Sequence, residues 1–204
     1  QSGAFGDADY DFTRDEVSPS IGAIWRARTG TDYYASYLQS FEAPDPAGGF
    51  INPDEFPDPQ QGEQWEIGVR QALFDDSVYA TLALFDLTKE NVVTADPEDP
   101  LRSVQIGEQE SRGVEFELQG EPINRLLVMA SASILDTEVT RDFTGLKGNE
   151  LANVPETSLS AGVIYRFAGP PLLQGLRIGV NGTFRGERFS DIGNDTELAS
   201  YARF

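Results

Sequence analysis

The chain has 204 residues, enough for one large or two small domains, and its 39% hydrophobic content supports an ordered structure. It contains no cysteine and no histidine, which excludes disulfides, thiolate catalysis, the Ser-His-Asp arrangement and imidazole metal ligands. With 34 acidic and 15 basic residues, its formal charge of -19 would repel nucleic acid and an anionic membrane surface.

No apolar run is long enough for a transmembrane helix. The longest, from Leu126 to Leu135, is interrupted by two serines and is far shorter than the ~20 residues that a spanning helix needs. Any membrane-spanning structure must therefore be built from strands. The chain begins without an initiator Met or the regions of a signal peptide, so we expect an internal segment of a longer protein.

Alternating apolar and polar residues predict about nine strands. In chain order they lie near 19–28, 33–41, 62–74, 78–94, 103–119, 125–140, 156–167, 176–189 and 198–204.

The strand predicted over 62–74 shows the alternation clearly. Trp65, Ile67 and Val69 share one face, and Glu66 and Arg70 lie on the opposite face. Gln71 breaks the pattern because it falls on the apolar side. The pattern predicts a sheet with one apolar and one polar face.

The connections alternate in length. Four are short and turn-like, at 29–32, 75–77, 120–124 and 168–175, and four are mostly longer and acidic, at 42–61, 95–102, 141–153 and 190–197. Short turns on one side and long loops on the other are typical of outer-membrane barrels.

Strand length favours the same arrangement. About 14 residues at ~3.4 Å each, tilted by ~45°, cover roughly 33 Å, more than the ~25 Å apolar band of an outer membrane. Alternation alone does not say which face is inside, so a soluble all-β binding module with polar faces outward remains an alternative.

Six short motifs occur in a fixed order along the chain. They are YASYLQSF at 34–41, GEQWEIGV at 62–69, ALFDLTKENV at 83–92, GEQESRGVE at 107–115, NVPE at 153–156 and GER at 186–188. Together they resemble the barrel of TonB-dependent ferric-siderophore receptors, a similarity that spans roughly residues 18 to 204.

The resemblance implies an all-β fold, an antiparallel transmembrane β-barrel segment with about nine strands of a barrel of about 22. We expect residues 1–204 to be a partial barrel domain, with 1–17 as an extracellular loop portion and 18–204 as barrel strands. The family's N-terminal plug and its last strands are expected to lie outside this chain.

The resemblance also implies the biological role. It predicts a receptor in the outer membrane of a Gram-negative bacterium that imports ferric siderophores, is embedded in lipid and is energised by TonB through the plug. A receptor for cobalamin or an oligosaccharide is an alternative, since one barrel hosts several cargoes. Acidic loops disfavour strongly anionic chelates, which favours ferric hydroxamates. No enzymatic activity, catalytic residue, cofactor or metal ligand is expected.

Charged wall residues are predicted to face the lumen, because charge in the lipid band is costly. They are Glu66, Arg70, Glu115, Glu117, Arg166, Arg177 and Arg185. Aromatic residues near strand ends are predicted to mark the membrane interfaces: Trp25, Tyr33, Tyr37, Trp65, Phe74, Tyr79 and Phe167.

Three aromatic residues in or beside the loop at 42–61 are candidates for ligand contact, namely Phe41, Phe50 and Phe56. Packing of the loop on itself is the alternative explanation for them.

Overall fold

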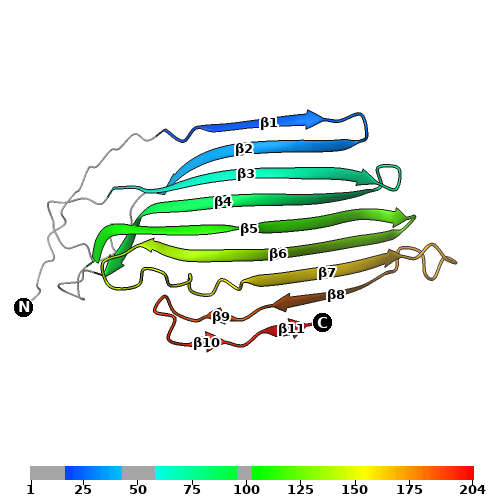
Figure 1. Cartoon of the computed structure of the whole chain (residues 1–204). Helices are drawn as coiled ribbons and strands as arrows, with labels where there is room; N and C mark the ends of the chain where they lie inside the picture. Colours follow the sequence, from blue (N-terminus) through cyan, green and yellow to red (C-terminus); the bar gives the residue numbers. More distant parts are fainter. Residues whose placement is uncertain (1–16, 43–57, 96–102) are drawn as a thin grey trace, which may run out of the picture.

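The computed structural model describes residues 17–42, 58–95 and 103–204. Within these ranges the main body is one nine-stranded antiparallel sheet in the order β1-β2-β3-β4-β5-β6-β7-β8-β11 (Figure 1). Its strands are β1 (Ser20–Arg26), β2 (Thr31–Glu42), β3 (Gln60–Leu73), β4 (Val78–Ala95), β5 (Ser103–Ile123), β6 (Leu126–Arg141), β7 (Thr157–Arg166), β8 (Arg177–Arg185) and β11 (Tyr201–Arg203). A small hairpin of β9 (Arg188–Phe189) and β10 (Glu197–Leu198) lies between β8 and β11 in the chain.

The central strands are long. β3, β4, β5 and β6 contain 14, 18, 21 and 16 residues, whereas strands of soluble proteins have a mode near 5–6. Each of them pairs with its neighbours in the chain. The predicted antiparallel sheet of long strands is therefore confirmed.

Three predicted elements have wrong boundaries. The connection at 120–124 is not a free turn, because β5 continues to Ile123, which pairs with Leu126 across a two-residue turn. The strand predicted over 176–189 is interrupted after Arg185, where the N–H of Gly186 donates to the Thr157 carbonyl at 2.8 Å. The strand predicted over 198–204 is divided in the same way, between β10 and β11.

The register defines an apolar face of the sheet. One row across five strands reads Ala35, Ile67, Leu84, Val114 and Ile134, and the next reads Tyr33, Val69, Leu82, Phe116, Ala132 and Leu159. These side chains are not covered by protein: Ile67 is 57% exposed and Ile134 is 64% exposed.

The sheet has almost no core of its own. Among the described residues only Val78, Ala83 and Val139 are buried apolar side chains. A continuous exposed apolar surface of this extent is what a lipid-facing wall needs, and a soluble protein would have to cover it. The soluble-module alternative therefore does not fit the structure.

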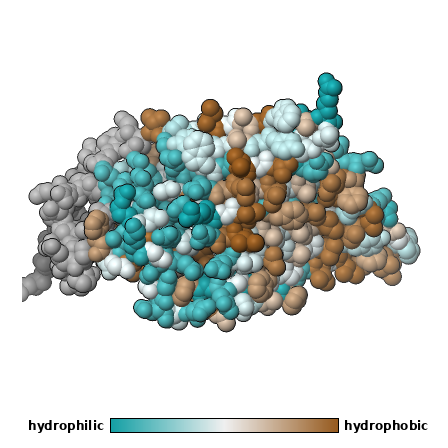
Figure 2. All heavy atoms as spheres, in the orientation of Figure 1, coloured by the Kyte–Doolittle hydropathy of each residue, from teal (hydrophilic) through white to brown (hydrophobic). Residues whose placement is uncertain are grey.

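The apolar surface occupies a band. In the view of Figure 2, hydrophobic residues gather over the part of the sheet nearest the short β3–β4 and β7–β8 turns, and hydrophilic residues gather over the opposite end. On the apolar face, the row beyond Ile67 and Leu84 already contains Asp86, Arg112 and Asp136. Nε of Arg112 lies 3.2 Å from Oδ2 of Asp136. The strands thus project past the apolar band.

Aromatic pairs lie on the apolar side. The rings of Tyr37 and Trp65 are 4.4 Å apart, in the same row as Arg112, and those of Trp25 and Tyr33 are 5.4 Å apart near the β1–β2 turn. Nε1 of Trp65 donates to Glu63 at 3.1 Å, so its polar edge points toward hydrophilic residues. This placement is typical of aromatic residues at a membrane interface.

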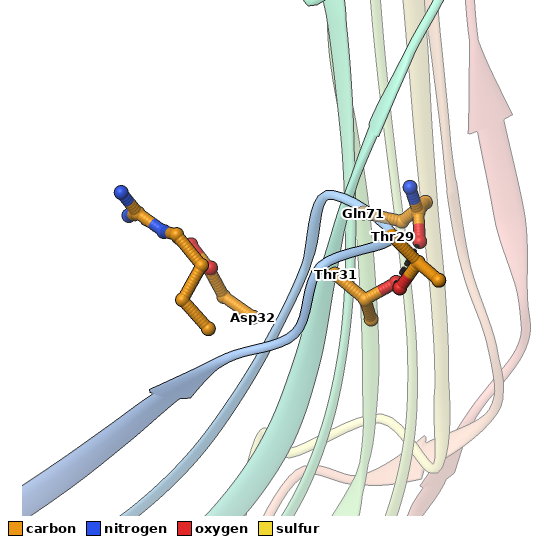
Figure 3. Close-up of polar contacts among 5 residues, drawn as sticks. Thr29, Thr31, Asp32 and Gln71 are labelled. Carbon is orange, nitrogen blue, oxygen red and sulfur yellow. Dashed lines mark hydrogen bonds and ion pairs between the residues drawn. The ribbon is translucent and has the colours of Figure 1, made fainter.

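The Gln71 exception has a local explanation. Its amide oxygen accepts a hydrogen bond from the Thr31 hydroxyl at 2.5 Å, and its nitrogen donates to the Ala72 carbonyl at 2.8 Å. Figure 3 shows Thr29, Thr31 and Gln71 gathered on one side of the sheet, with Asp32 on the other. The hydrogen-bonding groups of this polar side chain on the apolar face are therefore paired within the protein.

Among residues 17–42, 58–95 and 103–204, no helix has the length and apolarity needed to cross a membrane.

Candidate functional site

The face opposite the apolar rows, called the polar face below, carries an acidic patch on β3 and β5. Glu66, Glu115 and Glu117 form this patch. The structure adds Tyr34, which the sequence analysis did not single out. Its ring lies over Gly68, where an added Cβ would come within 2.3 Å of the Tyr34 Cζ. The Tyr34 hydroxyl hydrogen-bonds to Glu66. In the described part of the chain no cation lies within ion-pair distance of the acidic patch.

A strip of hydroxyl groups follows the acidic patch across β6 and β7. Register pairs Ser131 with Ser160 and Ser133 with Ser158, and places Glu115 opposite Ser133. These small side chains leave a hollow of about 190 Å³. The strip separates the acidic patch from the arginine residues of β8.

Three arginine residues gather around Tyr201 beyond this strip. Tyr201 opposes Arg185 in the register, and Arg203 lies two residues further along the same face of β11. The Cζ atoms of Arg188 and Arg203 are 5.5 and 5.3 Å from the Tyr201 ring centroid. No described carboxylate forms an ion pair with any of the three. We call Arg185, Arg188, Arg203 and Tyr201 the arginine cluster.

The remaining predicted wall residues share the polar face. Arg70 lies in register between Asp32 and Thr81, and its Cζ is 4.3 Å from the centroid of the Tyr79 ring. At the end with the short turns, Arg166 pairs in register with Arg177.

Arg166 also forms an ion pair with Glu121. All seven residues predicted to line the lumen are thus on one face, and only the orientation of that face toward a lumen remains a prediction.

The predicted ligand-contact residues are only partly described. Phe41 lies near the end of β2 and lines a groove of about 360 Å³ with Gln39, Gln61, Glu63 and Thr88. Phe50 and Phe56 lie outside the described residues. Their proposed contacts remain predictions.

The connections 142–156 and 186–197 hold each other by reciprocal hydrogen bonds. Oδ1 of Asn194 accepts from the N–H of Glu150 at 2.8 Å, and Nδ2 donates to the Glu150 carbonyl at 3.0 Å. Asn149 donates to the Ile192 carbonyl at 3.0 Å, and the N–H of Asn153 donates to the Phe189 carbonyl at 2.8 Å. The two loops therefore form one connected surface beside the arginine cluster.

Two aspartates order these loops. Burial raises the pKa of Asp142, but hydrogen bonds from the N–H of Leu146 and from Thr144 outweigh it, so the pKa is lowered. Asp191 accepts from the N–H of Asp195 at 3.1 Å, and hydrogen bonds of this kind lower its pKa. Both carboxylates are stabilised in their charged form.

The pKa of Glu150 is shifted in the opposite direction. Burial is the largest cause of the raised pKa of Glu150, and repulsion from the nearby Glu156, Asp136 and Glu197 raises it further.

In the ranges that the structure covers, no group of three or more His, Cys, Asp or Glu side chains is arranged to hold a metal ion.

Comparison with known proteins places this wall in a family. Residues 1–204 match the family described as TonB dependent receptor-like, beta-barrel. The metal-pseudopaline receptor CntO of Pseudomonas aeruginosa (strain UCBPP-PA14) is 32% identical over 201 residues, which cover 98% of this chain and 28% of that protein. The ferrichrome outer membrane transporter/phage receptor of Escherichia coli (strain K12) is 36% identical over 172 residues, covering 84% and 22%.

Solved structures of outer-membrane receptors have the same fold over most of this chain. The siderophore receptor PiuA from Acinetobacter baumannii superposes with a TM-score of 0.74 at 22% identity, covering 90% of this chain and 28% of that one. The ferric preacinetobactin receptor BauA from the same organism gives 0.74 at 25%, covering 91% and 28%. The chain spans about 28% of the length of CntO and of these two structures. The predicted fold and outer-membrane location are confirmed, and the chain belongs to the TonB-dependent receptor family, as part of its outer-membrane β-barrel.

Proposed function

We propose that this chain is a section of the wall of an outer-membrane receptor that imports ferric siderophores with energy delivered through TonB. The observation that carries the proposal is the two-faced wall, with an exposed apolar band on one side and charged and hydroxyl side chains on the other. The family match and relatives named as receptors for ferrichrome, ferric pyoverdine and ferrioxamine B support it.

The polar face would line the lumen. Carboxylates Glu66, Glu115 and Glu117 lack a cationic partner among the described residues, and the resemblance implies a plug domain inside the barrel. We assign these carboxylates to cationic groups of that plug, because charge pairs of this kind fix orientation and can be broken when the plug moves. The wall itself performs no catalysis.

The loop end of the sheet would face outward. The connections 142–156 and 186–197 and the groove beside Phe41 lie at this end, and the short turns lie at the other. Outer-membrane barrels have short periplasmic turns and longer extracellular loops. Chelate would therefore arrive at the linked loops. Phe41 opposes Gln61 in the register and so shares the outward face of Trp65, which makes a contact from inside the lumen less favourable for it than for Phe50 and Phe56.

The cargo proposal is a ferric hydroxamate. A formal charge of -19 disfavours a strongly anionic chelate during approach, and two of the relatives are named for ferrichrome and ferrioxamine B. A second candidate is a different metal chelate, because the relative that matches 98% of this chain is named as a metal-pseudopaline receptor.

Deletion of the gene for the full-length receptor tests the function. We expect the deleted strain to lose uptake of radiolabelled iron from at least one member of a panel of ferric chelates under iron limitation, and a plasmid copy to restore it. A parallel strain without TonB should show the same loss. Unchanged uptake of every chelate, with lost uptake of cobalamin or an oligosaccharide, would reject the siderophore assignment.

A further inference from the structure

We propose that the arginine cluster binds a carboxylate arm of the metal chelate during its passage along the wall. The inference rests on the proposed function and adds a docking site and a chemical requirement for the cargo.

The three arginine residues of the cluster lie around the Tyr201 ring. Arg188 and Arg203 approach the Tyr201 ring with their Cζ atoms 5.5 and 5.3 Å from its centroid, and Arg185 is the register partner of Tyr201. Three positive charges around one ring repel each other, and a bound negative charge would relieve that repulsion. Arginine is suited to this role because its planar fork binds a carboxylate through two parallel hydrogen bonds.

No described carboxylate lies within ion-pair distance of the cluster. Nη1 of Arg188 is buried and has no hydrogen-bond partner. Buried charged groups are normally paired, and an unpaired one in a native structure points to an absent ion, water or ligand. Nη1 of Arg188 is therefore a donor that an anionic oxygen of a ligand would satisfy.

The acidic patch of the described wall is too far away to supply the anion. Along the register row, Glu115 is followed by Ser133, Ser158 and then Arg185, so three strand spacings of ~4.8 Å separate the charges by about 14 Å. The intervening residues are serines, which carry no charge. Ser158 is only 8% exposed and makes no hydrogen bond through its hydroxyl within the described structure.

Position favours the chelate as the occupant. Arg185 ends β8, directly before the linked loop 186–197, at the end of the wall that would meet incoming cargo. The net charge acts on approach and is screened beyond about 8 Å in physiological salt, whereas the cluster acts at contact. The fitting cargo has a low net charge and one free carboxylate, such as a ferric hydroxamate with a carboxylate arm.

Paired probes test this in the full-length receptor. The probes are a linear ferric trihydroxamate with a terminal carboxylate and the same compound as its methyl ester, with binding measured on outer-membrane vesicles. We expect the carboxylate probe to bind at least tenfold more tightly. Arg188→Gln and Arg203→Gln should abolish the preference without weakening the ester, and Arg188→Lys should restore part of it. Arg28→Gln, which removes an equal charge at the opposite end of the wall, should preserve it.

Thermal unfolding without chelate separates the alternatives. If the cluster is unoccupied before cargo binds, Arg188→Gln should leave the melting temperature unchanged or raise it, because it removes a buried Nη1 without a hydrogen-bond partner and lowers the repulsion within the cluster. A lowered melting temperature with both probes weakened equally would show that a carboxylate of the plug or of another strand fills the cluster, and would overturn the proposal. Equal binding of both probes by the unmodified receptor overturns this inference alone, whereas binding of neither overturns the hydroxamate cargo as well.

Discussion

Leu82 and Thr81 are adjacent on β4 and test the assignment of the two faces. Leu82 lies on the apolar face between Val69 and Phe116 in the register. Thr81 lies on the polar face between Arg70 and Glu117. Replacing each residue with arginine adds the same charge one residue apart along the same strand.

The expected costs differ because the surroundings differ. The row of Leu82 lies midway between Trp65 and Leu73 on the neighbouring strand, near the middle of the apolar band. The nearest carboxylate on that face of β4, Asp86, is four residues away, about 14 Å along the strand. Leu82→Arg should therefore lower the free energy of unfolding by about 2–4 kcal/mol, roughly 30- to 700-fold in the folding equilibrium. Thr81→Arg would have Glu117 on one side and Arg70 on the other, so attraction and repulsion offset each other, and it should change the free energy of unfolding by less than about 1 kcal/mol.

The measurement is denaturant unfolding of the full-length receptor in phospholipid vesicles, followed by tryptophan fluorescence. Leu82→Ala separates the loss of the apolar side chain from the added charge. The amount of heat-resistant receptor in the outer membrane gives a second readout for variants that do not refold. If Thr81→Arg costs as much as Leu82→Arg, or more, the assignment of the faces is wrong.

Three further predictions concern the ends of the wall. Gly120→Ala should reduce stability by about 1–3 kcal/mol in the same unfolding assay, because Gly120 has a φ of 155° and its added Cβ would lie 2.1 Å from the Ser77 carbonyl oxygen; unchanged stability would contradict this backbone contact. In intact cells, a membrane-impermeant maleimide should label Asp195→Cys and leave Asp76→Cys unlabelled, and the reverse result would invert the orientation. In the loops, the pKa of Asp142 is lowered, so its stabilising contribution is present above the ordinary pKa of aspartate and is lost as pH falls through the folded-state pKa. The pKa of Glu150 is raised, so the fold favours its protonated form. After correction for the intrinsic pH dependence of amide exchange, the protection of 142–156 should therefore fall in acid in the unmodified receptor but not in Asp142→Asn. Glu150→Gln should increase that protection at neutral pH, and no difference among the three proteins would reject the assignment of these charges.

Periodicity was sufficient to predict the two faces. The period-2 pattern around Trp65 and Glu66 fixes which residues share a side, and the structure extends that pattern by register across the sheet. The turn at 120–124 was misjudged because Gly120, Pro122 and Asn124 are all turn-favouring residues. In the structure the first two lie at a register shift within β5, a position that tolerates a glycine with positive φ and a proline without an N–H.

The contacts of the candidate sites could not be predicted in the same way. Tyr34 covers Gly68 because the β2–β3 register places them opposite each other, and no local pattern encodes that pairing. Tyr201 and Arg203 do share a face by alternation, which was a usable signal. Arg188 follows the interruption at Gly186, where alternation no longer determines direction, so its approach to Tyr201 required the structure.

The strand order has a consequence for assembly. From β2 to β7, every strand pairs with the strand made just before it and the strand made just after it. A chain that enters the membrane in the order of its synthesis therefore has one growing edge at a time, and each new hairpin closes the edge left by the last. Each new strand also takes its register from the strand before it, so an error in one pairing affects the strands that follow. A slip of one residue at any pairing would turn the new strand's charged side chains toward lipid.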